Sequence, residues 1–316
     1  MTQRNQRPPG LGMGETGAIG APPGRAATGI PENRLLGIAL MVAAMMIVPF
    51  MDALAKHLSD RYAVSQLTWA RFFFHLAILA PIVLYHHGRR ALRPAQPGLQ
   101  LLRSGFTLLA TILFFAAIAR MPIADALALL FVSPMVVTAL SPVMLDERVG
   151  MRRWVAVAAG FAGALIILRP GFGVAQAGSF LAMGAGISFA FYTLLTRRLS
   201  GTAPPLVTLA YTAVTGAAVM SIAVIPDWIT PSPGDLLMMC GIGAIAATGH
   251  FLLIRAFDYA PASLLAPYSY SEIVMATAVG WFVFSDFPDR WTWAGIIVIV
   301  ASGIYISWRE RKHKTT

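Results

Sequence analysis

Long stretches without charged residues are the feature of this sequence that most constrains its fold. Nine segments lack Asp, Glu, Lys and Arg, and a tenth, residues 259–285, contains a single such residue, Glu272. An α-helix needs roughly 20 predominantly apolar residues to cross a bilayer. The pattern therefore predicts an all-α membrane protein with ten transmembrane helices, over residues 35–56, 64–85, 98–119, 122–143, 152–169, 178–197, 204–225, 234–255, 261–284 and 291–308.

The composition also favours a membrane protein. Hydrophobic residues make up 57% of the 316 residues and charged residues only 12%, whereas a soluble domain is roughly 25% charged. So few charged residues cannot cover the surface of a soluble enzyme, and so apolar a chain is not disordered. The apolar runs are continuous and do not alternate with polar residues, which favours helices over a β-barrel.

The two ends of the chain differ from the apolar segments. Residues 1–33 contain Pro8, Pro9 and several glycines but no long apolar run, which predicts a disordered tail. Residues 309–316 form a short basic tail. The single cysteine, Cys240, excludes a disulfide framework and a CxxC metal site. No P-loop, HExxH or GxSxG motif is present, and we expect no catalytic residues, metal or cofactor.

Lysine and arginine residues are distributed unevenly between the two sides of the predicted bundle. If the N-terminus is cytoplasmic, 18 of the 24 fall on the cytoplasmic side, including Arg103 after the second helix. Cytoplasmic loops of membrane proteins carry such an excess. We therefore expect both termini in the cytoplasm, and the net charge of +10 does not require a nucleic-acid partner.

Two segments about 140 residues apart share one pattern, in which a polar hinge and a proline precede an apolar helix. They read ARMPIADALALLFVSP at residues 119–134 and FDYAPASLLAPYSYSE at residues 257–272. The offset predicts a repeat of five helices, and because five is odd the second copy must be inverted. Inverted repeats are typical of alternating-access transporters, whose substrates bind near the bilayer midplane between the halves.

Further motifs are LTWARFFF at residues 67–74, LDERVGMRRW at residues 145–154 and APASLLAPYSYSE at residues 260–272. With these motifs and the ten-helix plan, the sequence resembles the EamA branch of the drug/metabolite transporter superfamily. The resemblance implies two EamA-like five-helix repeats, residues 34–170 and 171–308. DALAK at residues 52–56 suggests a subgroup that includes metabolite uptake carriers. One departure is Asp286, which stands where the family often has the glutamate of a Gly-Glu pair.

Polar residues inside predicted membrane helices are the candidate site residues, because each is costly in hydrocarbon. Glu272 lies near the middle of the ninth helix, five residues after Pro267, whose ring frees a backbone carbonyl one turn earlier. We expect Glu272 to bind substrate or a proton, or to bond a neighbouring helix as a neutral acid. Tyr268 and Tyr270 flank it as substrate contacts, and the repeat predicts that Phe131 and Ser133 lie opposite.

A second group lies near the non-cytoplasmic ends of the first two helices. Asp52 and Lys56 are four residues apart and share a helix face, so they can pair, and Arg71 can join them. This group is either a structural ion pair or a gate.

Histidines and tyrosines complete the candidates. His75 and His250 are either packing residues or members of a proton relay with Glu272. Tyr192 and Tyr211 are deep enough to stack on a planar ligand.

These features predict a secondary transporter in the bacterial inner membrane that moves a small organic metabolite by alternating access and is not an enzyme. The expected partners are this solute, the lipid bilayer and protons, and the chain is a monomer or a homodimer. Few fixed charges and several tyrosines favour riboflavin or a similar planar vitamin as substrate. The resemblance also allows uptake of S-adenosylmethionine, or export of amino acids, metallophores or other metabolites. A membrane-embedded enzyme or scaffold is the rival class.

Overall fold

The computed structural model describes residues 33–88, 96–146, 149–169, 177–199 and 202–314. The expected disorder of the N-terminal tail therefore lies outside the described residues. Within the described ranges every regular element is a helix, and all of them belong to one unit, Glu32–Thr316. The elements are α1 Arg34–Leu58, α2 Val64–His87, α3 Pro97–Ile118, α4 Ile123–Leu130, α5 Ser133–Met144, α6 Met151–Leu168, α7 Ala177–Arg198, α8 Pro205–Ala223, η2 Ile225–Asp227, α9 Pro233–Tyr259, α10 Ala262–Leu265, η3 Ala266–Tyr270, α11 Ser271–Phe284 and α12 Arg290–Lys314.

Local sequence explains where several helices begin and end. The Asn33 side chain accepts a hydrogen bond from the backbone N–H of Leu36, and Ser232 accepts one from Asp235, so both residues cap helices. Arg169 and Ser285 end α6 and α11 in the left-handed conformation that terminates many helices. The helix α12 continues to Lys314, through most of the expected C-terminal tail.

The ten predicted segments are all helical, but two of them are interrupted. The fourth divides into α4 and α5 at Phe131 and Val132, and the ninth divides into α10, η3 and α11. Pro134 and Pro267 lie at these interruptions and cannot donate the backbone hydrogen bonds of a continuous helix. Among the described residues, nine helical segments are long and apolar enough to cross a membrane. The interrupted ninth segment is the one missing from that set.

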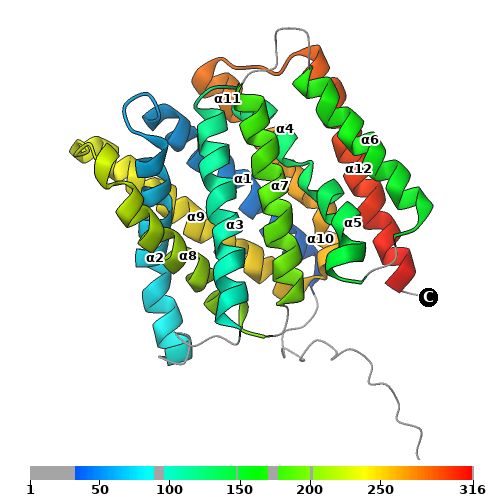
Figure 1. The fold of residues 1–316 in the computed structure, drawn as a ribbon, viewed down its shortest axis with the longest axis horizontal. Coiled ribbons are helices and arrows are strands. Elements are labelled where there is room, and N and C mark those ends of the chain that lie inside the picture. The colour runs from blue at the N-terminus through cyan, green and yellow to red at the C-terminus, as the bar shows by residue number, and fades with distance from the viewer. Residues whose placement is uncertain (1–32, 89–95, 147–148, 170–176, 200–201, 315–316) are drawn as a thin grey trace, which may run out of the picture. The chain divides into compact units, whose positions relative to one another are not determined.

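Helices far apart in the sequence pack side by side. The main pairs are α1 with α9, α3 with α7 and α6 with α12, and α2 lies against both α8 and α9. The pairs α3 with α7 and α6 with α12 are visible in Figure 1. A methyl group added at Gly163 would meet the Gly295 carbonyl oxygen at 3.0 Å, so glycine allows α6 and α12 to approach closely.

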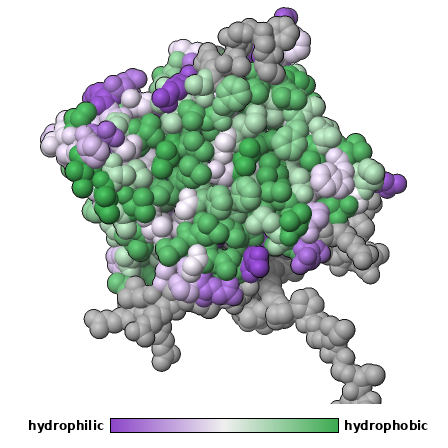
Figure 2. All heavy atoms as spheres, viewed as in Figure 1, coloured by the Kyte–Doolittle hydropathy of each residue, from purple (hydrophilic) through white to green (hydrophobic). Residues whose placement is uncertain are grey.

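The outward surface of the bundle is apolar. Figure 2 shows hydrophobic residues over most of one face and hydrophilic residues gathered toward its edges. Large exposed hydrophobic side chains include Val155 on α6, Phe282 on α11 and Ile297 on α12. A soluble protein rarely exposes so much apolar surface. The chain is therefore a multi-pass membrane protein whose outer side chains face lipid.

Candidate functional site

The two helix interruptions meet inside the bundle. The helices α4 and α11 are in contact, and the ring centroids of Phe131 and Tyr270 lie 4.9 Å apart. Both side chains are buried, and so is Ser133. A methyl group on Gly303 of α12 would overlap the Tyr270 hydroxyl, so the absence of a side chain there makes room for the tyrosine. The structure thus brings together two of the predicted substrate-contact residues, Phe131 and Tyr270, whose role in substrate binding stays a prediction.

Five of the predicted polar residues form a connected electrostatic group. Asp52 on α1 is 2% exposed and interacts with both the Arg71 guanidinium on α2 and the Glu272 carboxyl on α11. His75, also buried, stands one turn after Arg71, and its ring centroid lies 5.4 Å from that of His250 on α9. Arg71, Asp52, Glu272, His75 and His250 are called the buried charge group below, although only Asp52 and His75 are fully buried and the other three are half-buried.

Two nitrogen atoms in the buried charge group make no hydrogen bond within the described residues. Arg71 donates to the Thr111 hydroxyl on α3, while its Nε has no partner among the described residues. His75 Nε2 likewise has none, whereas His250 Nδ1 lies 2.8 Å from the Ala246 carbonyl oxygen. Carboxyl and imidazole groups arranged in this way can bind and pass on a proton, and the free donor of Arg71 can hold a polar ligand.

The expected pairing of Lys56 with Asp52 is wrong. Lys56 Nζ instead lies 2.8 Å from Asp286 Oδ2 and 2.9 Å from the Met121 carbonyl oxygen. Asp52 is one turn deeper in α1 and almost wholly buried, whereas Lys56 lies in the last turn of α1, within reach of Met121 and Asp286. The loop that follows α11 carries Asp286 to that position. Asp286, whose role the sequence left in doubt, is therefore the ion-pair partner of Lys56.

Two further ion pairs join helices of the first half to the second near the same end of the bundle. Arg169 Nη2 lies 2.5 Å from Asp289 Oδ1, and Arg61 Nη1 lies 3.2 Å from Asp235 Oδ2. Hydrogen bonds from Arg169 and from the backbone of Thr292 lower the pKa of Asp289 to about 2. Asp289 thus stays ionised at neutral pH. The pairs Lys56–Asp286, Arg169–Asp289 and Arg61–Asp235 are called the cross-half ion pairs below.

The remaining tyrosine candidates lie apart from the Phe131–Tyr270 contact. Tyr268 keeps 38% of its surface exposed. Tyr211 packs against a separate hydrophobic cluster that includes Leu79 and Val207. Tyr192 on α7 lies under the guanidinium of Arg103, whose central carbon is 5.1 Å from the ring centroid.

Arg103 is a residue that the sequence reasoning does not single out. It is counted with the cytoplasmic-side charges and falls inside the predicted helix 98–119, and the structure buries it in α3, where it is 2% exposed. The signal that could have located it is the spacing of polar residues in this helix. These residues recur every three or four positions, which puts them on one face, and all are buried: Gln100, Arg103, Ser104, Thr107 and Thr111.

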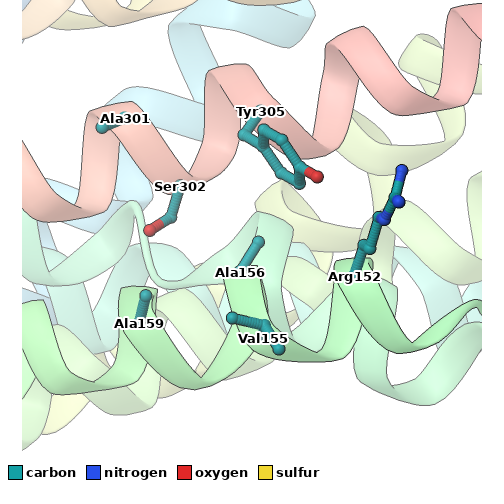
Figure 3. A pocket seen from close by; sticks show the side chains of 7 residues that line it. All are labelled: Arg152, Val155, Ala156, Ala159, Ala301, Ser302 and Tyr305. Carbon is teal, nitrogen blue, oxygen red and sulfur yellow. The ribbon is translucent and has the colours of Figure 1, made fainter.

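Two hollows on the surface of the described residues are lined by residues other than the predicted site residues. One, of about 380 Å³, lies between α6 and α12, where Arg152 and Tyr305 stand at one end and small residues line the rest (Figure 3). The other, of about 580 Å³, is lined by residues of α2, α8 and α9, among them His86, Leu206 and Arg255.

Comparison with known proteins gives one family. A profile of the EamA-like transporter family matches the chain twice, over residues 35–169 and 176–308. A riboflavin transporter of Vibrio cholerae is 30% identical over 290 residues, which cover 90% of this chain and 97% of that protein. An S-adenosylmethionine uptake transporter of Rickettsia prowazekii is 27% identical over 281 residues, covering 89% of this chain and 95% of that protein.

Two other similarities extend over comparable lengths. A pseudopaline exporter of Pseudomonas aeruginosa is 28% identical over 281 residues, which cover 86% of this chain and 95% of that protein. One chain of known crystal structure superposes with a TM-score of 0.63 and 18% identity, covering 87% of this chain and 98% of that chain. The last similarity shows the fold alone.

Proposed function

We propose that this chain, which belongs to the EamA-like transporter family, is a secondary carrier that moves a small organic metabolite by alternating access. Family and relatives point to transport and not to enzymatic catalysis. The observation that supports this mechanism is that helices of one matched segment pack against helices of the other. In our assignment the two segments form five-helix units over residues 34–170 and 171–308.

The helix contacts support two related halves. The pairing of α1 with α9 has its counterpart in α7 with α3, and that of α1 with α11 has its counterpart in α7 with α4. The pairs α2 with α8, α4 with α11 and α6 with α12 each join equivalent helices. Exchanging the halves leaves these contacts unchanged, as a two-fold axis requires. Because each half crosses the membrane an odd number of times, the second half is inverted, and the axis lies in the membrane plane.

The cross-half ion pairs are proposed to form a closed gate. Lys56, Arg169 and Arg61 belong to the first half and their three partners to the second. These contacts must break for the halves to separate at this end. The distribution of lysine and arginine assigns it to the non-cytoplasmic side. The inner membrane of a bacterium, with both chain termini in the cytoplasm, is the proposed location.

Riboflavin is the first substrate to test, and Phe131 and Tyr270 are the proposed aromatic contacts, with Ser133 beside them. The similarity to a riboflavin transporter supports this choice. Other relatives make S-adenosylmethionine and a metallophore the alternatives. The purified chain in proteoliposomes should take up one labelled solute of this panel above the level of protein-free vesicles. Uptake of none of the three would remove the proposed substrate range.

A further inference from the structure

A buried arginine lies between the two halves, at the end of the bundle away from the cross-half ion pairs. Arg103 is six residues after the start of α3, whereas the other end of α3 leads to Met121, which contacts Lys56. Its guanidinium meets α7 and α8 of the second half. It is thus a buried cation between the two halves of the proposed carrier, which separate during transport.

Neutral groups alone surround this cation in the described part of the chain. Arg103 Nη2 donates to the Thr208 carbonyl oxygen at 2.5 Å and to the Thr212 hydroxyl at 2.6 Å, and Nη1 donates to the Thr196 hydroxyl at 3.4 Å. The Tyr192 ring lies against the guanidinium face. No carboxylate within the described ranges lies at ion-pair distance from Arg103. A buried charge without a counter-charge is costly, so an anion would stabilise this site strongly.

Hydrogen-bond donors at this site remain unused. A guanidinium has five N–H groups, and Arg103 uses three in the bonds above, while its buried Nε has no partner among the described residues. Gln100 lies one turn earlier on the same face of α3 and is 0% exposed, and within the described ranges neither its amide nitrogen nor its amide oxygen has a partner. Buried polar groups usually find partners. The unpaired Arg103 Nε and the Gln100 amide are groups to which a polar ligand can bind.

The polar face of α3 connects Arg103 to the buried charge group. Thr107 and Thr111 continue this face, and Thr111 accepts the hydrogen bond from Arg71. Eight residues separate Arg103 from Thr111, a rise of about 12 Å along the helix. The two arginines therefore stand at two levels of one polar track along the bundle interior.

We propose that Arg103, with Gln100 and Tyr192, binds an oxyanion of the transported solute, a carboxylate or a phosphate. This assignment rests on the proposed carrier function. When the solute binds, the oxyanion replaces the threonine oxygens around the guanidinium, and the free Nε–H completes a charged, two-point contact. The preferred solute therefore carries a negative oxygen group, which riboflavin itself lacks.

Two matched pairs of ligands test this proposal, because the members of each pair differ by one oxyanion. They are S-adenosylmethionine with its decarboxylated analogue, and riboflavin 5′-phosphate with riboflavin. Dissociation constants are measured by calorimetry on the purified full chain. In at least one pair, we expect the oxyanion-bearing member to bind about tenfold more tightly, as a charge-assisted hydrogen bond allows. Equal affinities within both pairs, or binding of neither pair, would overturn the assignment.

Substitutions then attribute the preference to Arg103. Arg103→Gln should bring the two members to within about twofold, whereas Arg152→Gln, which removes an arginine at the surface hollow between α6 and α12, should keep the full preference. A preference that survives in folded Arg103→Gln rules the site out.

A milder variant covers the case in which Arg103→Gln does not fold. Arg103→Lys keeps the charge but loses the planar fork, and it should weaken the oxyanion-bearing member severalfold without changing the neutral one. Equal effects on both members would mean that Arg103 acts only in packing. Uptake of a labelled solute together with an oxyanion preference that no Arg103 variant changes would rule out the site and leave the carrier function standing. An Arg103-dependent preference without uptake of any solute would support the site and rule out the carrier function.

Discussion

At the scale of single residues, the most consequential side chains are acids and imidazoles held away from water between helices. Glu272 interacts electrostatically with Asp52, and Asp52 with Arg71, so a change of charge at one position is felt by the others. A charge at such a depth costs a few kcal/mol. The chain contains no nucleotide-binding motif, so we propose that a proton taken up at Glu272 couples transport to a pH gradient.

Glu272→Gln tests this coupling, because glutamine keeps the shape and polarity of the side chain but cannot ionise. In proteoliposomes with an imposed pH gradient, the variant should lose gradient-driven accumulation and keep exchange of labelled for unlabelled solute. Asp60→Asn, which removes an exposed carboxylate just after α1, is the control and should behave as wild type. Normal accumulation in Glu272→Gln would exclude the proton role, and loss of both activities would indicate substrate binding or packing instead.

At the scale of helices, the positions of the ten segments follow from the sequence, since charge-free runs of sufficient length have few alternatives in a bilayer. The prolines at equivalent positions predict that Phe131 lies opposite Tyr270, and in the structure the two rings are in contact. The partner of Lys56 is not predicted, because residue spacing within α1 reports only on neighbours along that helix and not on the loop that holds Asp286. Arg103 is not among the predicted site residues because a charge near a helix end is expected to reach water, whereas here it is buried against α7 and α8.

The packing of η3 against α12 gives a prediction at this scale. Gly303→Ala would push a methyl group into the Tyr270 hydroxyl, and such overpacking costs about 1–3 kcal/mol. We expect lower thermal stability and reduced uptake. Adding Tyr270→Phe removes the hydroxyl and should restore part of the stability, measured as the melting temperature in detergent. No restoration in the double variant would show that this contact does not limit the packing.

At the scale of the whole molecule, the account depends on the inverted relation of the two halves. Reporter fusions at residue 97 and after residue 230 should report opposite sides of the membrane, because the first follows the second span and the second follows the seventh. A cytoplasmic signal at residue 97 and a non-cytoplasmic signal after residue 230 are expected from the lysine and arginine distribution. Signals from the same side would refute the inverted arrangement.

Alternating access itself makes a claim about the two ends of the bundle together. Breaking the Lys56–Asp286 pair with Lys56→Gln and Asp286→Asn removes one cross-half ion pair and should favour opening at that end. Because opening at one end requires closure at the other, the hollow lined by His86 and Leu206 should narrow. This perturbation needs no knowledge of the substrate.

The most direct measurement is of distances between spin labels at both ends, in the starting protein and in the variant without the Lys56–Asp286 pair. One label pair, at Asp60 and Thr230, spans the two halves at the end held by the cross-half ion pairs, and the other, at His86 and Leu206, spans them at the opposite hollow. The account predicts that the Asp60–Thr230 distance lengthens in the variant while the His86–Leu206 distance shortens. Distances that stay fixed, or that lengthen together at both ends, would contradict alternating access in this chain.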